Sequence, residues 1–323
     1  MKIFNKIKEY KKTNNLVLAI GNFDGVHLGH QAILEQAKNI AKEKNYRFGV
    51  MTFEPHPKTY FNPDLKNFRL TPINIKKRLL TEFEIEELYV IDFNHSFSQT
   101  EPEDFIKTWV KDKLNVKHIV VGYDFVFGKN GKGNAETLRQ MSSKYDFDVT
   151  IVSQISNQDG LNYSSTAVRN ALFEGFPLKA ASILGRFFEL NGRIQLGRQT
   201  GAKLGFPTAN TAIGNFFKPK EGIYAVFADI ILDGKHKILK GVTNIGGSPT
   251  FDINNYLVET HLLNFSGDIY KKNLTIYLVD YIRDSIKFNS VDDLIKEITL
   301  DTIKAQDILL KYEKSDLLKK YNN

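Results

Sequence analysis

Short apolar runs alternate with amphipathic helical stretches along the first half of the chain. Residues 16–20, Leu-Val-Leu-Ala-Ile, form an unbroken apolar run that ends at Gly21 and predicts a buried parallel strand. A helix is predicted next, because apolar residues recur at helical spacing at Ile33, Ala37, Ile40 and Ala41. Further strand-like runs, separated by helical stretches, lie at residues 48–53, 88–91, 118–121 and 149–152. This alternation predicts βαβ units and a mostly parallel sheet, closed by short helices near 165–174 and 178–184.

The pattern changes near Arg186. β-rich segments joined by Gly, Asn, Asp and Pro turns occupy residues 187–194, 223–232, 237–243, 256–265 and 274–282. No long helix interrupts them, which predicts an antiparallel barrel or sandwich. An apolar stripe from Val291 to Leu309 predicts a final helix with Ser290 as its N-cap. We therefore expect two domains, residues 1–184 and residues 185–323.

Composition supports two packed domains and excludes thiol chemistry. The 323 residues are 42% hydrophobic and 25% charged, which is enough apolar content for two cores. Cysteine is absent, which excludes disulfides, thiolate metal sites and cysteine nucleophiles. No apolar stretch approaches the roughly 18 residues of a membrane helix, and residues 1–12 lack the apolar core of a secretory signal. The expected compartment is the cytoplasm, with no membrane partner.

The formal charge of +7 favours anionic small molecules over nucleic acid. Lysines are spread along the chain and interleaved with acidic residues, as in Lys42-Glu43-Lys44, rather than clustered. A modest positive excess suits nucleotides and phosphates. We expect no nucleic-acid partner, and the sequence does not predict an oligomeric state.

The most informative segment is residues 21–30, GNFDGVHLGH, which follows the first strand and opens a helix. Ligands gather at this position in open α/β sheets, and the N–H groups of a helix N-terminus favour a phosphate. His27 and His30 flank Gly29 and are expected to place both imidazoles on one side of a tight turn, where they donate hydrogen bonds to a phosphate. Chelation of zinc by the two histidines is the alternative, but no third ligand is evident and cysteine is missing. A P-loop is excluded, because five residues separate Gly122 from Gly128 and Asn130 follows Lys129.

The segment 21–30 resembles the nucleotidyltransferase half of bacterial bifunctional riboflavin kinase/FAD synthetases. The HLGH element is shared by many adenylyl- and cytidylyltransferases, so further elements make the resemblance specific. These are Thr-Phe-Glu-Pro-His-Pro at 52–57, Gly-Tyr-Asp-Phe-Val-Phe-Gly at 122–128 and Ser-Ser-Thr-Ala-Val-Arg at 164–169. The resemblance implies a Rossmann-like nucleotidyltransferase domain that joins FMN to the adenylyl group of ATP and releases pyrophosphate.

Such a reaction needs no covalent enzyme intermediate, so catalysis is mostly positioning and charge stabilisation. His27 and His30 are the expected catalytic donors. Ser165 and Thr166 at a helix start, with Arg169 one turn later, are expected to hold the β- and γ-phosphates. Other expected nucleotide or phosphate contacts are Gly21, Asn22, Phe23, Asp24 and Gly29, and expected flavin-side contacts are His56 and Asp124.

A second set of motifs resembles the riboflavin kinase half of the same family. They are Gly-Phe-Pro-Thr-Ala-Asn at 205–210, Gly-Ile-Tyr-Ala at 222–225, Thr-Asn-Ile-Gly at 243–246, Pro-Thr-Phe at 249–251, Val-Glu-Thr-His at 258–261 and Tyr-Ile-Arg at 281–283. The resemblance implies a six-stranded Greek-key β-barrel with a C-terminal helix. It also implies that Thr208 and Asn210 bind Mg²⁺ with ATP, that Gly205 and Pro207 contact the nucleotide, and that Arg283 contacts the flavin. Glu259 in a β-segment would be the general base that deprotonates the ribityl 5′-hydroxyl of riboflavin.

The expected molecule is thus an enzyme whose small-molecule partners are riboflavin, FMN, FAD, ATP, ADP and pyrophosphate. Departures from the family pattern lie at Tyr163, Ala202, Ser248 and Lys271. Ala202 and Ser248 replace arginines near the kinase loops, where Arg198 or Lys203 could compensate. Alternatives are a chain with one competent half, or a flavin-binding storage or regulatory protein without turnover.

Overall fold

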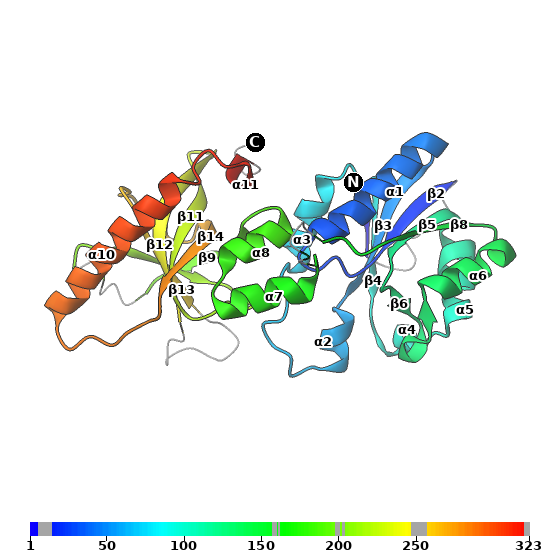
Figure 1. Cartoon of the computed structure of the whole chain (residues 1–323), viewed down its shortest axis with the longest axis horizontal. Coiled ribbons are helices and arrows are strands. Elements are labelled where there is room, and N and C mark those ends of the chain that lie inside the picture. The colour runs from blue at the N-terminus through cyan, green and yellow to red at the C-terminus, as the bar shows by residue number, and fades with distance from the viewer. Residues whose placement is uncertain are drawn as a thin grey trace. The chain divides into compact units, whose positions relative to one another are not determined.

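The computed structural model describes residues 1–5, 15–156, 160, 162–197, 201, 204–246 and 257–319. The chain forms two compact units (Figure 1). The N-terminal unit contains Met1–Lys66 and Thr71–Ser164, and the C-terminal unit contains Asn67–Leu70 and Ser165–Asn323.

The N-terminal unit is built on a parallel sheet with the strand order β1-β4-β3-β2-β5-β8. The strands are β1 (Lys2–Phe4), β2 (Leu16–Ile20), β3 (Arg47–Glu54), β4 (Glu87–Asp92), β5 (Val116–Gly122) and β8 (Asp148–Val152). The predicted parallel sheet is confirmed. Strand β1 was not predicted, because three residues that include a lysine carry no recognisable strand pattern.

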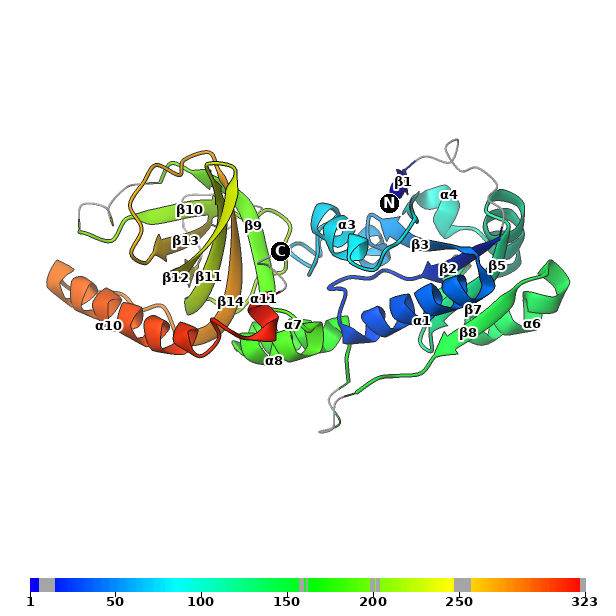
Figure 2. The ribbon, with the colours of Figure 1, turned by 90° about the horizontal axis from the view of Figure 1, so that it is seen from above.

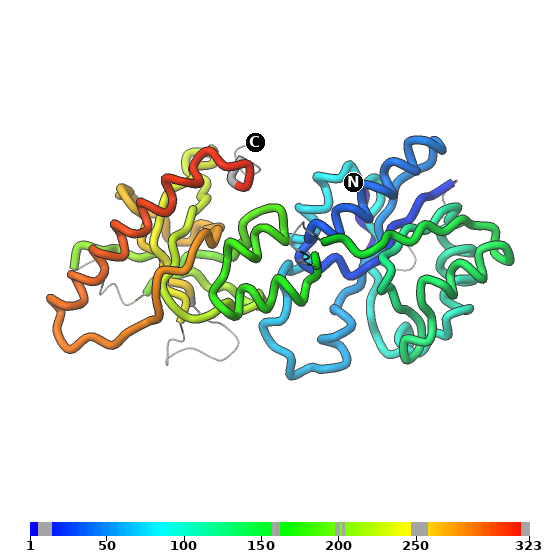
Figure 3. Tube along the Cα trace, in the orientation of Figure 1, coloured from blue at the N-terminus to red at the C-terminus, as the bar shows by residue number. Residues whose placement is uncertain are grey.

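Helices alternate with these strands along the sequence, and the tube in Figure 3 follows the course of the chain from blue at the N-terminus to red at the C-terminus. They are α1 (Leu28–Lys44), α2 (Pro57–Phe61), α3 (Ile73–Thr81), α4 (His95–Ser98), α5 (Pro102–Phe105), a π-helical segment (Ile106–Lys113) and α6 (Ala135–Tyr145). A small hairpin of β6 (Val126–Phe127) and β7 (Gly133–Asn134) flanks a 3₁₀ turn (Lys129–Gly131).

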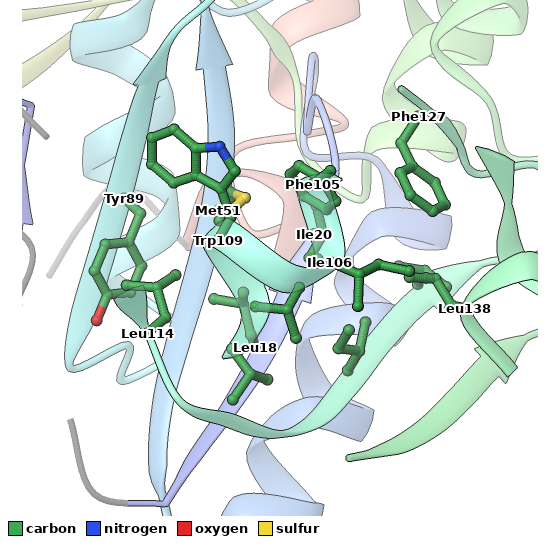
Figure 4. Close-up of a cluster of buried hydrophobic side chains, with 14 of the residues drawn as sticks. Leu18, Ile20, Met51, Tyr89, Phe105, Ile106, Trp109, Leu114, Phe127 and Leu138 are labelled. Atoms are coloured by element: carbon green, nitrogen blue, oxygen red, sulfur yellow. The ribbon is translucent and has the colours of Figure 1, made fainter. Parts of the chain in front are cut away.

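One hydrophobic core of this unit fills the space between the sheet and the α5–π-helix segment (Figure 4). Trp109, Phe105 and Ile106 pack with Leu18 and Met51 from the central strands. All five residues of β2 are buried. Because a central strand of a parallel sheet is covered on both faces, an unbroken apolar run suits this position. This core packs against the central strands, whose carboxyl ends lead into the loops of the first site.

The C-terminal unit contains a closed antiparallel barrel with the strand order β10-β13-β12-β11-β14-β9. The strands are β9 (Phe188–Gln195), β10 (Thr208–Ala212), β11 (Gly222–Leu232), β12 (Lys235–Ile245), β13 (Leu257–Leu262) and β14 (Asn273–Arg283). The expectation of a barrel is therefore confirmed over the alternative of a sandwich. Closure leaves no open sheet edge.

Helices of this unit are α7 (Ser165–Glu174), α8 (Pro177–Leu184), α10 (Val291–Leu310) and α11 (Asp316–Lys319). Helix α10 runs along the barrel (Figure 2), where Ala305 and Leu309 pack with Ala225, Phe227 and Val279. The predicted C-terminal helix and its N-cap are confirmed, since the backbone N–H of Asp293 donates to Ser290 Oγ at 3.1 Å. Across the described residues, we find no helix with the length and apolarity that a membrane crossing requires.

Candidate active sites

The first site lies where the carboxyl ends of three parallel strands meet. Residues 21–24 follow β2, His56 follows β3 and Asp124 follows β5, and β2 lies between β3 and β5 in the sheet. The strand order reverses at β2, and such a switch point is where open α/β sheets bind ligands. The structure therefore brings together, at one edge of the sheet, the expected nucleotide segment and both expected flavin-side residues of this unit.

The turn after β2 has a strained backbone that is held by hydrogen bonds. Phe23 and Val26 have φ of 48° and 42°, and Gly25 between them has φ of 87°. Positive φ is rare for a bulky or β-branched residue. The carboxylate of Asp24, 1% exposed, accepts a hydrogen bond from the backbone N–H of Thr71 at 3.0 Å, and Gly25 N donates to Thr71 Oγ1 at 2.9 Å. Asp24 thus anchors the turn to the segment before α3.

The structure brings the rings of His27 and His30 into a stack whose centroids are 3.6 Å apart. His27 is the N-cap of α1, and its Nδ1 accepts the backbone N–H of His30 at 3.3 Å. This bond fixes the proton of a neutral His27 ring on Nε2, so Nε2 is a donor. Gly29 permits the arrangement, because a Cβ there would lie 2.9 Å from the Tyr163 carbonyl oxygen and 3.1 Å from His27 Nδ1.

Asn22 and His56, two further residues of this edge, each have a side-chain atom that is available to a ligand. The Asn22 side-chain oxygen is buried and has no hydrogen-bond partner among the described residues. A buried oxygen of this kind needs a donor. His56 caps α2, since its Nδ1 accepts the backbone N–H of Lys58 at 3.1 Å. Its Nε2 therefore carries the proton in the neutral ring, as in His27.

Ser165, Thr166 and Arg169 lie on α7, which belongs to the C-terminal unit. Ser165 and Thr166 are in the first turn, as expected. Arg169 is buried: its Nε donates to the Phe68 carbonyl at 3.0 Å and its guanidinium lies 3.7 Å from the centre of the Phe68 ring. The guanidinium is thereby held in one orientation on residues 67–70 of the same unit.

The second site is on the outer face of the barrel. Strands β10 and β13 pair so that Asn210 lies opposite Glu259 and Thr208 lies opposite His261. Val258 and Thr260 are fully buried whereas Glu259 is exposed, so Glu259 points outward. Directly opposed side chains of an antiparallel pair have Cβ atoms roughly 5 Å apart. The register therefore places the expected general base beside both expected metal ligands.

The polar row continues across neighbouring strands. Gln195 of β9 pairs with Asn210, and Asn244 of β12 pairs with Glu259. Asn244 Oδ1 accepts a hydrogen bond from Ser285 Oγ at 3.1 Å, which leaves its amide nitrogen as a donor. Asn244 belongs to the family motif at residues 243–246, but no role was predicted for it. Its place on the same face as Glu259 follows from the alternation of side chains along β12, and this alternation is informative only once the register with β13 is known.

Asn210 offers the hard oxygen that Mg²⁺ prefers. Its Nδ2 faces the Thr208 carbonyl at 3.5 Å, so the amide oxygen is on the other side of the group. Gly197 packs against this amide, since a Cβ at 197 would lie 2.2 Å from Nδ2. No group of three His, Asp or Glu residues is placed for a metal in the described parts of the chain. A magnesium ion here would be held by the side-chain oxygens of Asn210 and Thr208 together with the phosphates of ATP and water.

Of the remaining expected residues, Arg283 is engaged within the unit. Its Nε and Nη2 donate to Asp301 Oδ1 and Oδ2 of α10 at 2.9 and 2.6 Å, and Glu297 lies 3.3 Å away. Gly205 has φ of 87°, and the Pro207 carbonyl accepts a hydrogen bond from His261 Nδ1 at 2.9 Å.

Two of the four departures from the family pattern, Tyr163 and Lys271, lie within the residues that the structure describes. Lys271, where glycine is common, has a left-handed φ of 63°, which explains the usual glycine. The Tyr163 carbonyl abuts Gly29. Arg198, Ala202, Lys203, Ser248 and the motif 249–251 lie outside the described residues.

Comparisons with known proteins match both halves of the chain. A family model described as FAD synthetase matches residues 9–167, and one described as riboflavin kinase matches residues 184–309. A bifunctional riboflavin kinase/FMN adenylyltransferase of Buchnera aphidicola subsp. Schizaphis graminum is 36% identical over 304 residues, covering 93% of this chain and 96% of the relative. The chain belongs to the bifunctional riboflavin kinase/FMN adenylyltransferase family. The resemblance stated from its motifs is confirmed.

Other members of the family agree over most of their length. Those of Escherichia coli strain K12 and Bacillus subtilis strain 168 are each 36% identical, and the match covers 90% of this chain and 92% and 91% of those relatives. A crystal structure of a Streptococcus pneumoniae protein called a macrolide-efflux protein superposes with a TM-score of 0.83 at 29% identity, covering 94% of this chain and 98% of that one. Each of these matches covers at least 90% of this chain, so each extends over both units.

Proposed function

We propose that this chain phosphorylates riboflavin to FMN and then transfers the adenylyl group of ATP to FMN, giving FAD and pyrophosphate. The observation that carries the proposal is that each unit has its own set of reactive side chains. The N-terminal unit has the stacked pair His27 and His30, and the barrel has Glu259 in register with Asn210. Binding of a flavin alone would require neither set.

In the adenylyltransferase site, the FMN phosphate attacks the α-phosphorus of ATP and pyrophosphate leaves. Negative charge grows on the oxygens of the transferred group, and fixed donors stabilise it. We assign this task to His27 and His30 at the start of α1, where the helix N-terminus adds its own positive field. Gly21, Asn22 and Phe23 shape the turn around the nucleotide, with Asp24 and Gly29 as its structural supports.

Ser165, Thr166 and Arg169 would hold the terminal phosphates through the start of α7. His56 and Asp124 follow β3 and β5, and we assign them to the flavin side of the same edge. The imidazole of His56, with Nδ1 committed to the helix cap, would present Nε2–H to the substrate.

In the kinase site, Glu259 accepts the proton of the ribityl hydroxyl as that oxygen attacks the γ-phosphorus of ATP. Asn210 and Thr208 would bind Mg²⁺ together with the nucleotide, alongside Gly205 and Pro207. When bound, the ion neutralises charge on the phosphate oxygens. The residues of the chain orient the hydroxyl, remove its proton and hold the amide oxygen of Asn210 in place. Arg283 lies at the end of β14, where its ion pair with Asp301 holds it, and we assign it to the flavin-binding part of this site.

The FMN made by the kinase site is the substrate of the adenylyltransferase site, and we assign the two functions to residues 185–323 and residues 1–184. Both reactions use ATP and the sequence has no cysteine, and the compartment we propose is the cytoplasm. ADP and pyrophosphate are the other products.

The test is to separate the two activities by substitution. His30→Ala should reduce FAD formation from FMN by on the order of 10²–10³ and leave riboflavin phosphorylation nearly unchanged, because one transition-state donor is lost. Glu259→Ala should stop FMN formation while added FMN is still converted to FAD. Loss of both activities in both folded variants would overturn the assignment of two sites.

A further inference from the structure

Lys76 of α3 is a lysine whose side chain is entirely buried, with 0% exposed. Lysine is almost never fully buried unless its ammonium group is satisfied, because desolvating a charge is costly. Its Nζ donates to the backbone carbonyl of Asn22 at 2.7 Å and approaches Thr52 Oγ1 at 3.3 Å. The ammonium therefore ends beneath the residue that follows Gly21 in the ligand-facing turn.

The same carbonyl receives a second donor. Thr52 Oγ1, on the fully buried Thr52 of β3, donates to Asn22 O at 3.2 Å. Lys76, Thr52 and Asn22 thus form a closed trio that links α3, β3 and the turn. An apolar side chain in place of Lys76 would fill the volume but would leave this partly buried carbonyl with one donor fewer.

The turn needs such support because its own backbone is unfavourable. Phe23 and Val26 both have positive φ, and such residues persist only where the surroundings over-determine them. Thr71 holds one side of the turn through Asp24 and Gly25. Lys76 holds the other side through Asn22. Thr71, just before α3, and Lys76, within α3, therefore hold the turn from both sides.

We propose that Lys76 is a positioning residue for adenylyl transfer. By holding the Asn22 carbonyl, it fixes the strained turn so that His27 and His30 face the reacting phosphate with little freedom to move. This inference rests on the proposed function of the first site. Its expected kinetic signature is a lower kcat, because a loosened turn still admits ATP and FMN but no longer holds the donors at the geometry of the transition state.

The experiment compares variants of the full-length chain with FMN and ATP as substrates. Lys76→Met keeps the length and apolar character of the stem but removes the donor, and kcat should fall on the order of 10- to 100-fold with KM values within about threefold. Lys76→Gln restores a neutral donor to the Asn22 carbonyl and should recover at least about threefold of that loss. Lys77→Met, at the partly exposed neighbouring position, is the matched control and should keep kcat within about twofold.

Riboflavin phosphorylation by the same samples should be unchanged, because Lys76 and Thr52 lie in the N-terminal unit, and urea unfolding of each variant reports whether that unit is folded. Thr52→Val removes the other donor without deleting a charge, and it should lower kcat for FAD formation by roughly 3- to 10-fold at constant KM. That variant decides the question if Lys76→Met does not fold. Wild-type kcat in Lys76→Met, or in Thr52→Val where it is the deciding variant, would overturn the proposal, as would an equal loss in Lys77→Met. If His30→Ala also kept full FAD formation, the proposed site itself would be wrong, whereas an inactive His30→Ala beside a fully active Lys76→Met would refute only the positioning role.

Discussion

The substitution Gly29→Ala tests whether the stacked histidines need the exact spacing that the structure gives them. A Cβ at residue 29 would lie 2.9 Å from the Tyr163 carbonyl oxygen, 3.1 Å from His27 Nδ1 and 3.2 Å from His27 Cε1, whereas ordinary contacts begin at 3.4 Å. The Tyr163 backbone or the helix start must therefore yield by about 0.5 Å, and the His27 ring by about 0.3 Å. The hydrogen bond from His30 N to His27 Nδ1 is already 3.3 Å long, so it has little room to stretch.

A displacement of 1 Å in a catalytic group costs about 10²-fold in rate, so half that shift predicts a loss in kcat on the order of 10-fold for FAD formation. Stability should change little, because alanine is the better helix former by up to about 1 kcal/mol and offsets part of the strain. The assay is steady-state conversion of FMN to FAD, with riboflavin phosphorylation measured on the same protein. Asn39→Ala, on the exposed face of α1, makes a comparable gain in helix propensity without approaching the histidines. An unchanged kcat in Gly29→Ala would show that the histidines do not need this spacing, and an equal loss in Asn39→Ala would show the same.

Two further predictions concern stability and are measured by urea unfolding. Asp301→Ala removes the 2%-exposed partner of Arg283 and should lower the free energy of unfolding of the barrel unit by about 2–4 kcal/mol. The control Asp307→Ala, on the exposed side of α10, should change this free energy by less than about 0.5 kcal/mol. Equal effects of the two substitutions would show that the Arg283–Asp301 pair does not hold the helix. Burial, followed by the nearby charge of Lys44, lowers the pKa of His118, so the unfolded chain binds a proton more readily and stability should fall as the pH drops below about 6.5. His118→Asn should flatten that fall between about pH 7 and pH 5, and an unchanged slope would contradict it.

The strands with a clear apolar pattern and the long helices were predictable because their patterns are local. Residues 16–20 are apolar throughout, and the structure buries all of them in β2. The stripe from Val291 to Leu309 likewise became α10, with Ser290 capping it as predicted. Such elements carry their signal in the spacing of their own residues.

Strand β10 was not predicted because its residues are short and polar. Thr-Ala-Asn-Thr-Ala reads as a turn by composition, yet Asn210 pairs with both Glu259 and Gln195 in the barrel. The strand exists because neighbouring strands supply its hydrogen bonds, and Thr211 turns its buried side chain inward. That information resides in residues 15 and 49 positions away from Asn210.

The clamps on the first site were missed for the same physical reason. Lys76 in a helical stretch reads as a solvated lysine, and Thr71 reads as a helix-start residue. Their partners Asn22 and Asp24 are 54 and 47 positions away in sequence. In contrast, the two histidines and the glycine between them could be predicted, since their proximity depends only on the turn that contains them.

The most direct measurement is incubation of the purified chain with riboflavin, ATP and Mg²⁺, followed by chromatographic separation of the flavins. FMN should appear first, and FAD should accumulate as FMN is consumed. Accumulation of FMN without FAD, conversion of added FMN with no phosphorylation of riboflavin, or release of neither product would contradict the claim that both sites of this chain are active.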